Sequence, residues 1–122
     1  MAMRPIKPDD VTVIAGFSAD GWVVKDRLYS QALLIAAERA WGIAARPVAS
    51  LTVDVLALLA DLPVKPTLLL LGTGERMERP PADFVRSARD QGMVVEFMDS
   101  HAAARTYNVL VTEGRPVAAL LL

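Results

Sequence analysis

The segment best suited to bind a ligand through its backbone is Gly72-Thr73-Gly74, which directly follows a strongly apolar run. Glycines at the end of a buried strand let backbone amides approach a ligand, and ligands favour the carboxyl ends of sheet strands. The segment is not a dinucleotide-binding fingerprint, because Met77 stands where the third glycine is required. No Gly-Lys-Ser/Thr follows it, so it is not a phosphate loop either. It remains a candidate anion cradle, with a tight turn as the favoured interpretation.

A second group of polar side chains shares one face of the helix expected near the C-terminus. Its members are His101, Arg105, Asn108 and Thr112, at spacings of four, three and four residues. Imidazole, guanidinium, amide and hydroxyl groups can together bind an anion or the carboxylate of a partner. The same stripe is also the usual outward side of an amphipathic helix, and that interpretation is favoured.

Catalysis is less expected than binding, because no nucleophile is paired with a base. Asp99 and Ser100 precede His101, but both are more readily explained as helix caps. The carboxylates Glu75 and Glu78 lie in a proline-flanked loop, where we expect them to be solvated. Cysteine is absent and there is one histidine, which excludes thiolate chemistry and sulfur-bound or multi-histidine metal sites. We therefore predict no catalytic residues, no metal and no cofactor.

The composition indicates one globular domain without a nucleic-acid partner. The 122 residues are 53% hydrophobic and 22% charged, with a net charge of −1. A nucleic-acid protein relies on a surplus of positive charge, which this chain lacks. No apolar run approaches the roughly 20 residues that a membrane span requires. The start of the chain has neither a secretory signal nor a transit-peptide pattern, so we expect a cytoplasmic location.

The N-terminal part is predicted to form a β-meander of two or three antiparallel strands. A β-branched, apolar strand is expected over Val11 to Phe17, and Asp20-Gly21 before Trp22 is a strong hairpin signal. Residues 28–43 are ambiguous: local propensity favours a helix, whereas a strand at Leu28 to Ile35 would extend the meander. The strand followed by an irregular connection is preferred, on the strength of the resemblance described below.

From residue 52 onward, helical and strand patterns alternate. Thr52 is a candidate N-cap with Asp54 in the first turn, and Gly92 and Gly114 are candidate helix ends. The expected elements are a helix over 53–61, a central strand over 67–71, a helix opened by residues 80–83, a buried strand over 93–98, a helix from 99 or 100 to about 113, and a strand over 117–122. This alternation predicts a single α/β layered domain over residues 1–122.

Several segments together resemble one known family. They are Leu68 to Gly74, Pro81, Gly92, Glu96 to Met98, Ala103 to Leu110 and Glu113 to Leu121. The pattern is similar to a small α/β family of mostly uncharacterised prokaryotic proteins that includes the mitochondrial complex I assembly factor. The resemblance covers residues 67–122 well and residues 11–35 only in general pattern.

This resemblance implies a three-layer fold around a mixed β-sheet with one antiparallel strand, and it brings no established catalytic activity that could be carried over. The related eukaryotic protein helps to assemble a respiratory complex by binding other proteins. The chain shows no mitochondrial targeting segment, and its N-terminal half diverges, so no partner-binding surface is carried over.

We therefore expect a non-enzymatic module that binds an unidentified protein partner, as an assembly or accessory factor. The surface is expected to involve the Gly-Thr-Gly loop and the start of the last helix. The candidate binding residues are Gly72, Thr73, Gly74, Arg76, His101, Arg105, Thr106 and Asn108. The alternative is a protein, either a binder or an enzyme, that holds a small molecule or an anion at the same loop and helix start. A third interpretation is a homo-oligomer formed through an exposed strand edge of the meander.

Overall fold

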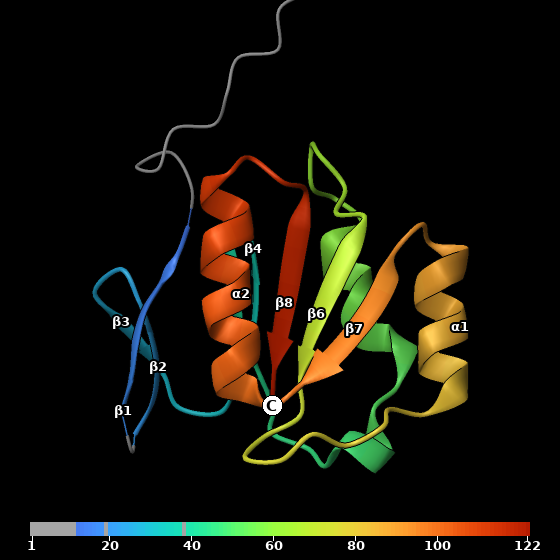
Figure 1. Ribbon diagram of the computed structural model, residues 1–122, viewed down its shortest axis with the longest axis horizontal. Coiled ribbons are helices and arrows are strands. Elements are labelled where there is room, and N and C mark those ends of the chain that lie inside the picture. The colour runs from blue at the N-terminus through green and yellow to red at the C-terminus, as the bar shows by residue number, and fades with distance from the viewer. Residues whose placement is uncertain (1–11, 19, 38) are drawn as a thin grey trace, which may run out of the picture.

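The computed structural model of the chain describes residues 12–18, 20–37 and 39–122. Its centre is a five-stranded sheet (Figure 1). The strands run in the order β5 (Ala40–Ile43), β4 (Ala32–Ala36), β8 (Val117–Leu121), β6 (Leu68–Gly72) and β7 (Val94–Met98). β6 pairs in parallel with β7 and β8, whereas β4 pairs antiparallel with both of its neighbours. The predicted mixed sheet with one antiparallel strand is confirmed.

The predicted meander is also confirmed, as a separate three-stranded antiparallel sheet. It consists of β1 (Ile14–Ser18), β2 (Gly21–Val24) and β3 (Arg27–Tyr29), in that order. Gly21 adopts a φ of 137° at the β1–β2 turn, where a side chain would collide with the backbone of Tyr29. Val11, the expected start of the first strand, lies outside the described residues.

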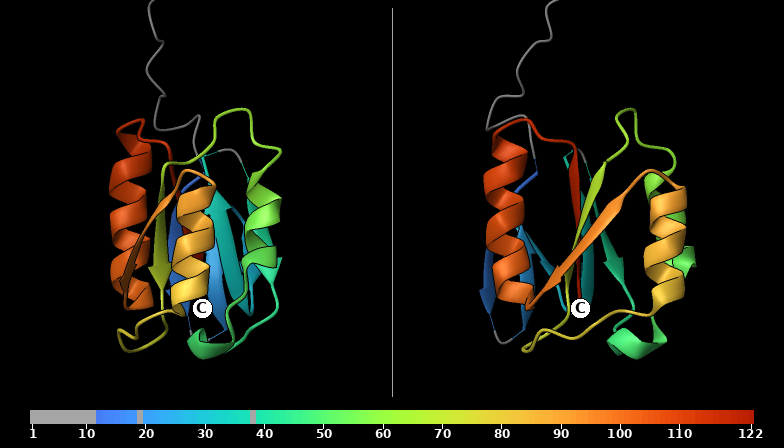
Figure 2. Two further views of the ribbon diagram at one scale, coloured as in Figure 1. Left: turned by 90° about the vertical axis from the view of Figure 1, so that its right-hand side faces the viewer. Right: turned by 45° about the vertical axis from the view of Figure 1, so that its right-hand side comes forward.

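The sheet and the elements on its two faces make three layers, as Figure 2 shows edge-on. On one face lie α2 (Ser100–Thr112) and the meander, and on the other lie α1 (Ala82–Asp90) and a 3-10 helix, η3 (Val53–Leu59). Alternate residues of each strand supply the two cores. In β8, for example, Val117, Ala119 and Leu121 face α2, whereas Ala118 and Leu120 face α1 and η3. The predicted three-layer fold is thereby confirmed.

The strand preferred within residues 28–43 is confirmed in place of the helix that local propensity favours, because tertiary position overrides that propensity. The segment contains no helix where the structure describes it, and β4 joins the central sheet instead of extending the meander. The irregular connection expected after Ile35 is wrong, since Ala40–Ile43 forms β5. All five residues of β4 are buried, because the strand lies between β5 and β8 with both faces covered. Such a strand is apolar throughout and resembles a buried helix in sequence.

Three smaller expectations differ in detail: the type of the helix at 53–61, the cap at Thr52 and the burial of the strand at 93–98. The helix expected at 53–61 is a 3-10 helix, and the Thr52 hydroxyl bonds the Asp54 carboxylate instead of capping the backbone. The hydrogen bond from Thr52 is the main reason why the pKa of Asp54 is lowered. The strand expected at 93–98 is β7, which lies at the edge of the sheet, so Val94 and Glu96 are exposed. The cap at Asp99 is confirmed, because its side chain accepts from the amide of Ala102.

Candidate functional site

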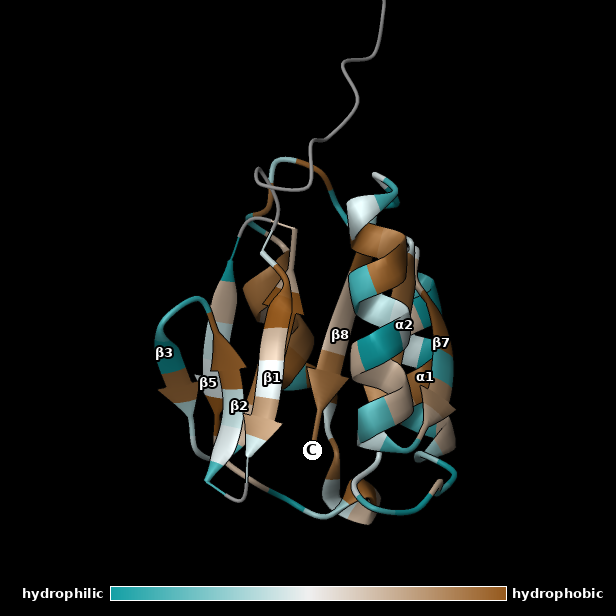
Figure 3. Cartoon of the chain, turned by 60° about the vertical axis from the view of Figure 1, so that its left-hand side comes forward, coloured by the Kyte–Doolittle hydropathy of each residue, from teal (hydrophilic) through white to brown (hydrophobic). Residues whose placement is uncertain are grey.

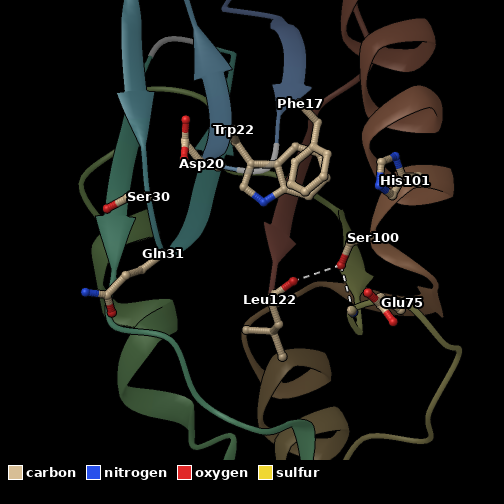
Figure 4. A pocket seen from close by; sticks show the side chains of 11 residues that line it. Phe17, Asp20, Trp22, Ser30, Gln31, Glu75, Ser100, His101 and Leu122 are labelled. Carbon is tan, nitrogen blue, oxygen red and sulfur yellow. Dashed lines mark hydrogen bonds between the residues drawn. The ribbon is translucent and has the colours of Figure 1, made fainter.

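A pocket of about 260 Å³ lies where the carboxyl ends of β6 and β8 meet the start of α2 and the meander (Figure 4). The β1–β2 hairpin, the link from β3 to β4, the loop after β6, the first turn of α2 and the end of β8 all contribute. The lining residues are Phe17, Asp20, Gly21, Trp22, Ser30, Gln31, Gly74, Glu75, Ser100, His101 and Leu122. Parallel strands therefore place their carboxyl ends at a hollow, as is usual for ligand sites in sheets of this kind.

Three aromatic rings form one side of this pocket. Phe17 and Trp22 are cross-strand partners on β1 and β2, and their ring centroids lie 4.5 Å apart. The His101 imidazole, from the first turn of α2, stands edge-on to Phe17 at 4.7 Å and lies 5.8 Å from Trp22. Trp22 is only 4% exposed, whereas Phe17 is 48% exposed. The hairpin thus supports an accessible phenyl ring on a buried indole.

Ser100, a buried residue, joins three elements at the base of the pocket. Its hydroxyl donates to the carbonyl oxygen of Leu122 at 3.0 Å and accepts from the amide of Gly74 at 2.8 Å. Its own amide donates to the Gly74 carbonyl oxygen at 2.8 Å. The Ser100 hydroxyl donates its hydrogen bond to Leu122, and the His101 ring stands edge-on to Phe17. The two side chains therefore do not form a nucleophile–base pair.

The Gly-Thr-Gly loop is held by internal hydrogen bonds. The Thr73 amide donates to the Met98 carbonyl oxygen, and the Thr73 hydroxyl accepts from the amide of Glu78 at 3.0 Å. Since the Gly74 amide is bonded to Ser100, the backbone donors at positions 73 and 74 are both engaged within the protein. A Cβ at Gly72 would lie 2.8 Å from Ser100 Cα, so this glycine permits the close approach of β6 and α2.

Tyr107 and Asn108 fasten the meander to α2. The Tyr107 hydroxyl donates to the Thr12 carbonyl oxygen at 2.7 Å, and burial raises the pKa of this phenol. The Asn108 side chain accepts from the Ile14 amide and donates to the Ile14 carbonyl oxygen, both at 2.8 Å. Through these bonds Tyr107 and Asn108 hold β1 and the residues just before it against α2, and Figure 3 shows the edge of β1 facing this helix.

The structure brings only part of the predicted binding residues together. Gly74 and His101 line the pocket, and Gly72 and Thr73 lie next to it at the end of β6. The remaining four are not among its lining residues: Arg76, Arg105, Thr106 and Asn108. A binding role for each of them stays a prediction.

Nine of the eleven lining residues were not among the predicted binding residues, and four of these nine carry an aromatic ring or a carboxylate. The four are Phe17, Asp20, Trp22 and Glu75. The Asp20-Gly21 turn was the available signal for the first three, because a two-residue hairpin loop sets the residues before and after it opposite each other. Among the residues that the structure describes, no cluster of three or more histidine, aspartate or glutamate side chains could hold a metal ion.

Known proteins share both the sequence pattern and the fold. The pattern of the family described as "Protein of unknown function (DUF498/DUF598)" matches residues 14–122. A Bos taurus protein named NADH dehydrogenase [ubiquinone] 1 alpha subcomplex assembly factor 3 is 31% identical over 111 residues, which are 89% of this chain and 59% of that protein. A Francisella tularensis protein named 13 kDa major membrane protein is 38% identical over 61 residues, 50% of each chain. The chain thus spans about half of the length of these relatives.

A solved structure agrees with the fold over the whole chain. A Mth938-like domain from Bordetella pertussis superposes with a TM-score of 0.80 at 28% identity, covering 100% of this chain and 90% of that one. None of the helices that the structure of our chain describes has the length and apolarity needed to cross a bilayer. The cytoplasmic location stays a prediction, and the name of the Francisella relative places that protein at a membrane.

Proposed function

This chain belongs to the DUF498/DUF598 family of proteins of unknown function, and we propose that it binds a protein partner, as an assembly or accessory factor, without transforming a substrate. The observation that carries the proposal is the accessible Phe17 ring beside the pocket. Aromatic side chains that are exposed next to a partly buried pocket are typical anchors of protein interfaces.

The chemistry of the pocket supports binding over catalysis. The Ser100 hydroxyl donates a hydrogen bond to the carbonyl oxygen of Leu122, and His101 contacts aromatic rings instead of a nucleophile. A general base needs its proton donor within hydrogen-bond reach, and no such donor pairs with His101 among the described residues. The pocket therefore provides a hollow, aromatic rings and carboxylates for binding, without a pair of groups that could carry out a reaction.

The name of one relative supports an assembly role. The bovine relative is named as an assembly factor, and the match reaches across 89% of this chain. Because it covers only 59% of that protein, a partner is not transferred from it, and the proposal concerns a type of activity. Self-association through the meander stays a separate prediction.

The anion-binding alternative is less well supported by the geometry. It needs free backbone donors in the Gly-Thr-Gly loop, and the amides of Thr73 and Gly74 donate to Met98 and Ser100. Arg76 and Arg105, the cations expected to assist, do not line the pocket.

Site-specific photo-cross-linking tests the proposal. A benzoylphenylalanine placed at Phe17 should give a discrete protein adduct in cells, because the ring sits at the interface. The same residue placed at Val64 is the control, since Val64 is 64% exposed in the loop before β6, at the opposite end of that strand. Excess wild-type protein should suppress the adduct, whereas a Phe17→Glu variant should not. Equal adducts from both positions, or an adduct that wild-type protein does not suppress, would count against the proposal.

A further inference from the structure

We propose that the pocket beside Phe17 and Trp22 receives an arginine side chain of the protein partner. The inference rests on the proposed function and adds the chemistry that the pocket recognises.

Among the described residues that line the pocket, two carry carboxylates and none is basic apart from His101. Asp20 reaches it from the β1–β2 hairpin and Glu75 from the loop after β6 (Figure 4). Among the described residues, neither carboxylate takes part in an ion pair. A partner that brings a cation here gains two carboxylates on different sides, which favours a positively charged group over a neutral or negative one.

The start of α2 does not reverse this preference. A helix N-terminus attracts anions through its free amides and its dipole. Here the Asp99 carboxylate accepts from the amide of Ala102 at 2.9 Å, and the Ser100 amide donates to the Gly74 carbonyl oxygen. The negative charge of Asp99 therefore already compensates the positive end of the helix.

The other aromatic rings show which cation fits. Three partly exposed rings lie away from the pocket, and an arginine of the chain lies over each of them. The distances from the arginine Cζ to the ring centroid are 5.1 Å for Arg27 and Tyr29, 5.0 Å for Arg39 and Trp41, and 5.6 Å for Arg79 and Phe97. Of the remaining rings, Phe84 and Tyr107 are buried in the cores.

Phe17, which packs on the buried Trp22, is thus the accessible ring that no arginine of the described residues covers. A planar guanidinium stacks on aromatic faces and bonds carboxylates in a fork, so it matches both features of the pocket. A volume of about 260 Å³ falls just below the range of about 300–1,000 Å³ typical of drug-sized ligands, and it suits one long side chain.

Peptide titration followed by NMR tests the inference. The probe is a capped pentapeptide with a central arginine between glycine and serine residues, and its partners carry citrulline or lysine instead. The arginine peptide should shift the indole N–H signal of Trp22 and the amide of His101. The indole signal of Trp41 is the internal control, because Trp41 packs against the core on the other side of the sheet and its ring already lies under Arg39. Citrulline has the shape of arginine without its charge, so it should bind at least several-fold more weakly.

Charge-neutralising variants locate the site. Asp20→Asn and Glu75→Gln should each weaken binding of the arginine peptide by about twofold to fivefold, the effect of losing one partly exposed ion pair. Glu78→Gln is the matched control, because it removes the same charge from the same loop without lining the pocket. It should leave the affinity unchanged.

Three outcomes would overturn the inference: equal binding of the citrulline or lysine peptide, equal shifts at Trp41 and Trp22, or no shift with arginine at any concentration. If cross-linking at Phe17 still yields its adduct in that case, the inference fails and the proposed function stands. Loss of the adduct together with intact arginine binding would instead remove the proposed function and leave a site for a small guanidinium compound, against the partner named here.

Discussion

The five-stranded sheet and the three-stranded meander are held in place by contacts of different kinds. The sheet has apolar cores on both faces, and every residue of β4 and β8 is buried. The meander buries Trp22 and Val24 on one side, while most of β1 and β3 is exposed. Hydrogen bonds from Tyr107 and Asn108 join β1 to α2.

This difference separates the stability of the fold from the shape of the pocket. Gly74 and Leu122 directly follow β6 and β8, and Ser100 begins α2, so the sheet and its core position them. Phe17 and Trp22 belong to the meander, and their position depends on how β1 lies against α2. A change that loosens the meander should therefore alter the pocket while most of the fold remains.

The largest expected effect tests the sheet side of the comparison. Leu120→Ala truncates a fully buried side chain of β8 and should lower the free energy of unfolding by about 2–5 kcal/mol, because it removes apolar contacts and leaves a cavity. Leu28→Ala is the matched change in β3, where the side chain is 47% exposed, and it should stay within about 0.5 kcal/mol. Urea unfolding measures both. A comparable loss from the two variants would show that side-chain packing holds the meander as firmly as it holds the sheet.

An intermediate effect is expected at the anchor between the meander and α2. Asn108→Ala removes both hydrogen bonds to Ile14 and should lower the free energy of unfolding by about 1–3 kcal/mol, because a half-buried amide and carbonyl lose their partners. Amide exchange should accelerate in β1 and β2, and protection in β6 and β8 should be kept.

Thr112→Val is the control for this prediction. The Thr112 hydroxyl bonds only carbonyls of its own helix, so its loss should leave exchange in the meander unchanged. If Asn108→Ala accelerated exchange equally in β1 and β8, the meander and the sheet would be one cooperative unit.

The elements that could be predicted from the sequence are those with strong local signals. The Asp20-Gly21 turn, the apolar run before Gly72 and the cap at Asp99 each depend on residues close together in the chain. Residues 28–43 lacked such a signal, because alanine and leucine favour a helix locally, whereas β4 is a strand through its neighbours β5 and β8. A local pattern therefore does not predict the secondary structure of a segment whose conformation is set by the strands that it pairs with.

The same reason explains why only part of the pocket was found. Gly74 follows from the rule that ligand sites lie at the carboxyl ends of sheet strands, and His101 follows from the polar stripe on the last helix. Phe17 and Trp22 reach the pocket because β1 docks on α2 through Asn108 and Ile14, which are 94 residues apart. No periodicity in the sequence encodes that contact. Asn108 was consequently interpreted as part of a binding stripe, although its amide bonds the backbone of β1.

The smallest expected effect concerns the second anchor, and it depends on pH. Tyr107→Phe removes the bond to the Thr12 carbonyl oxygen and should cost about 0.5–1.5 kcal/mol near neutral pH. Burial raises the pKa of Tyr107 in the folded protein, so the wild type should lose stability as the pH rises above about 10, where the phenol ionises in the unfolded chain. The variant has no phenol at this position and lacks that loss. The stability advantage of the wild type should therefore shrink as the pH rises through this range, as measured by urea unfolding of both proteins at each pH. An advantage that stays constant up to pH 11 would show that Tyr107 is as accessible to solvent in the folded protein as in the unfolded chain, and that the meander covers it less firmly than the anchor implies.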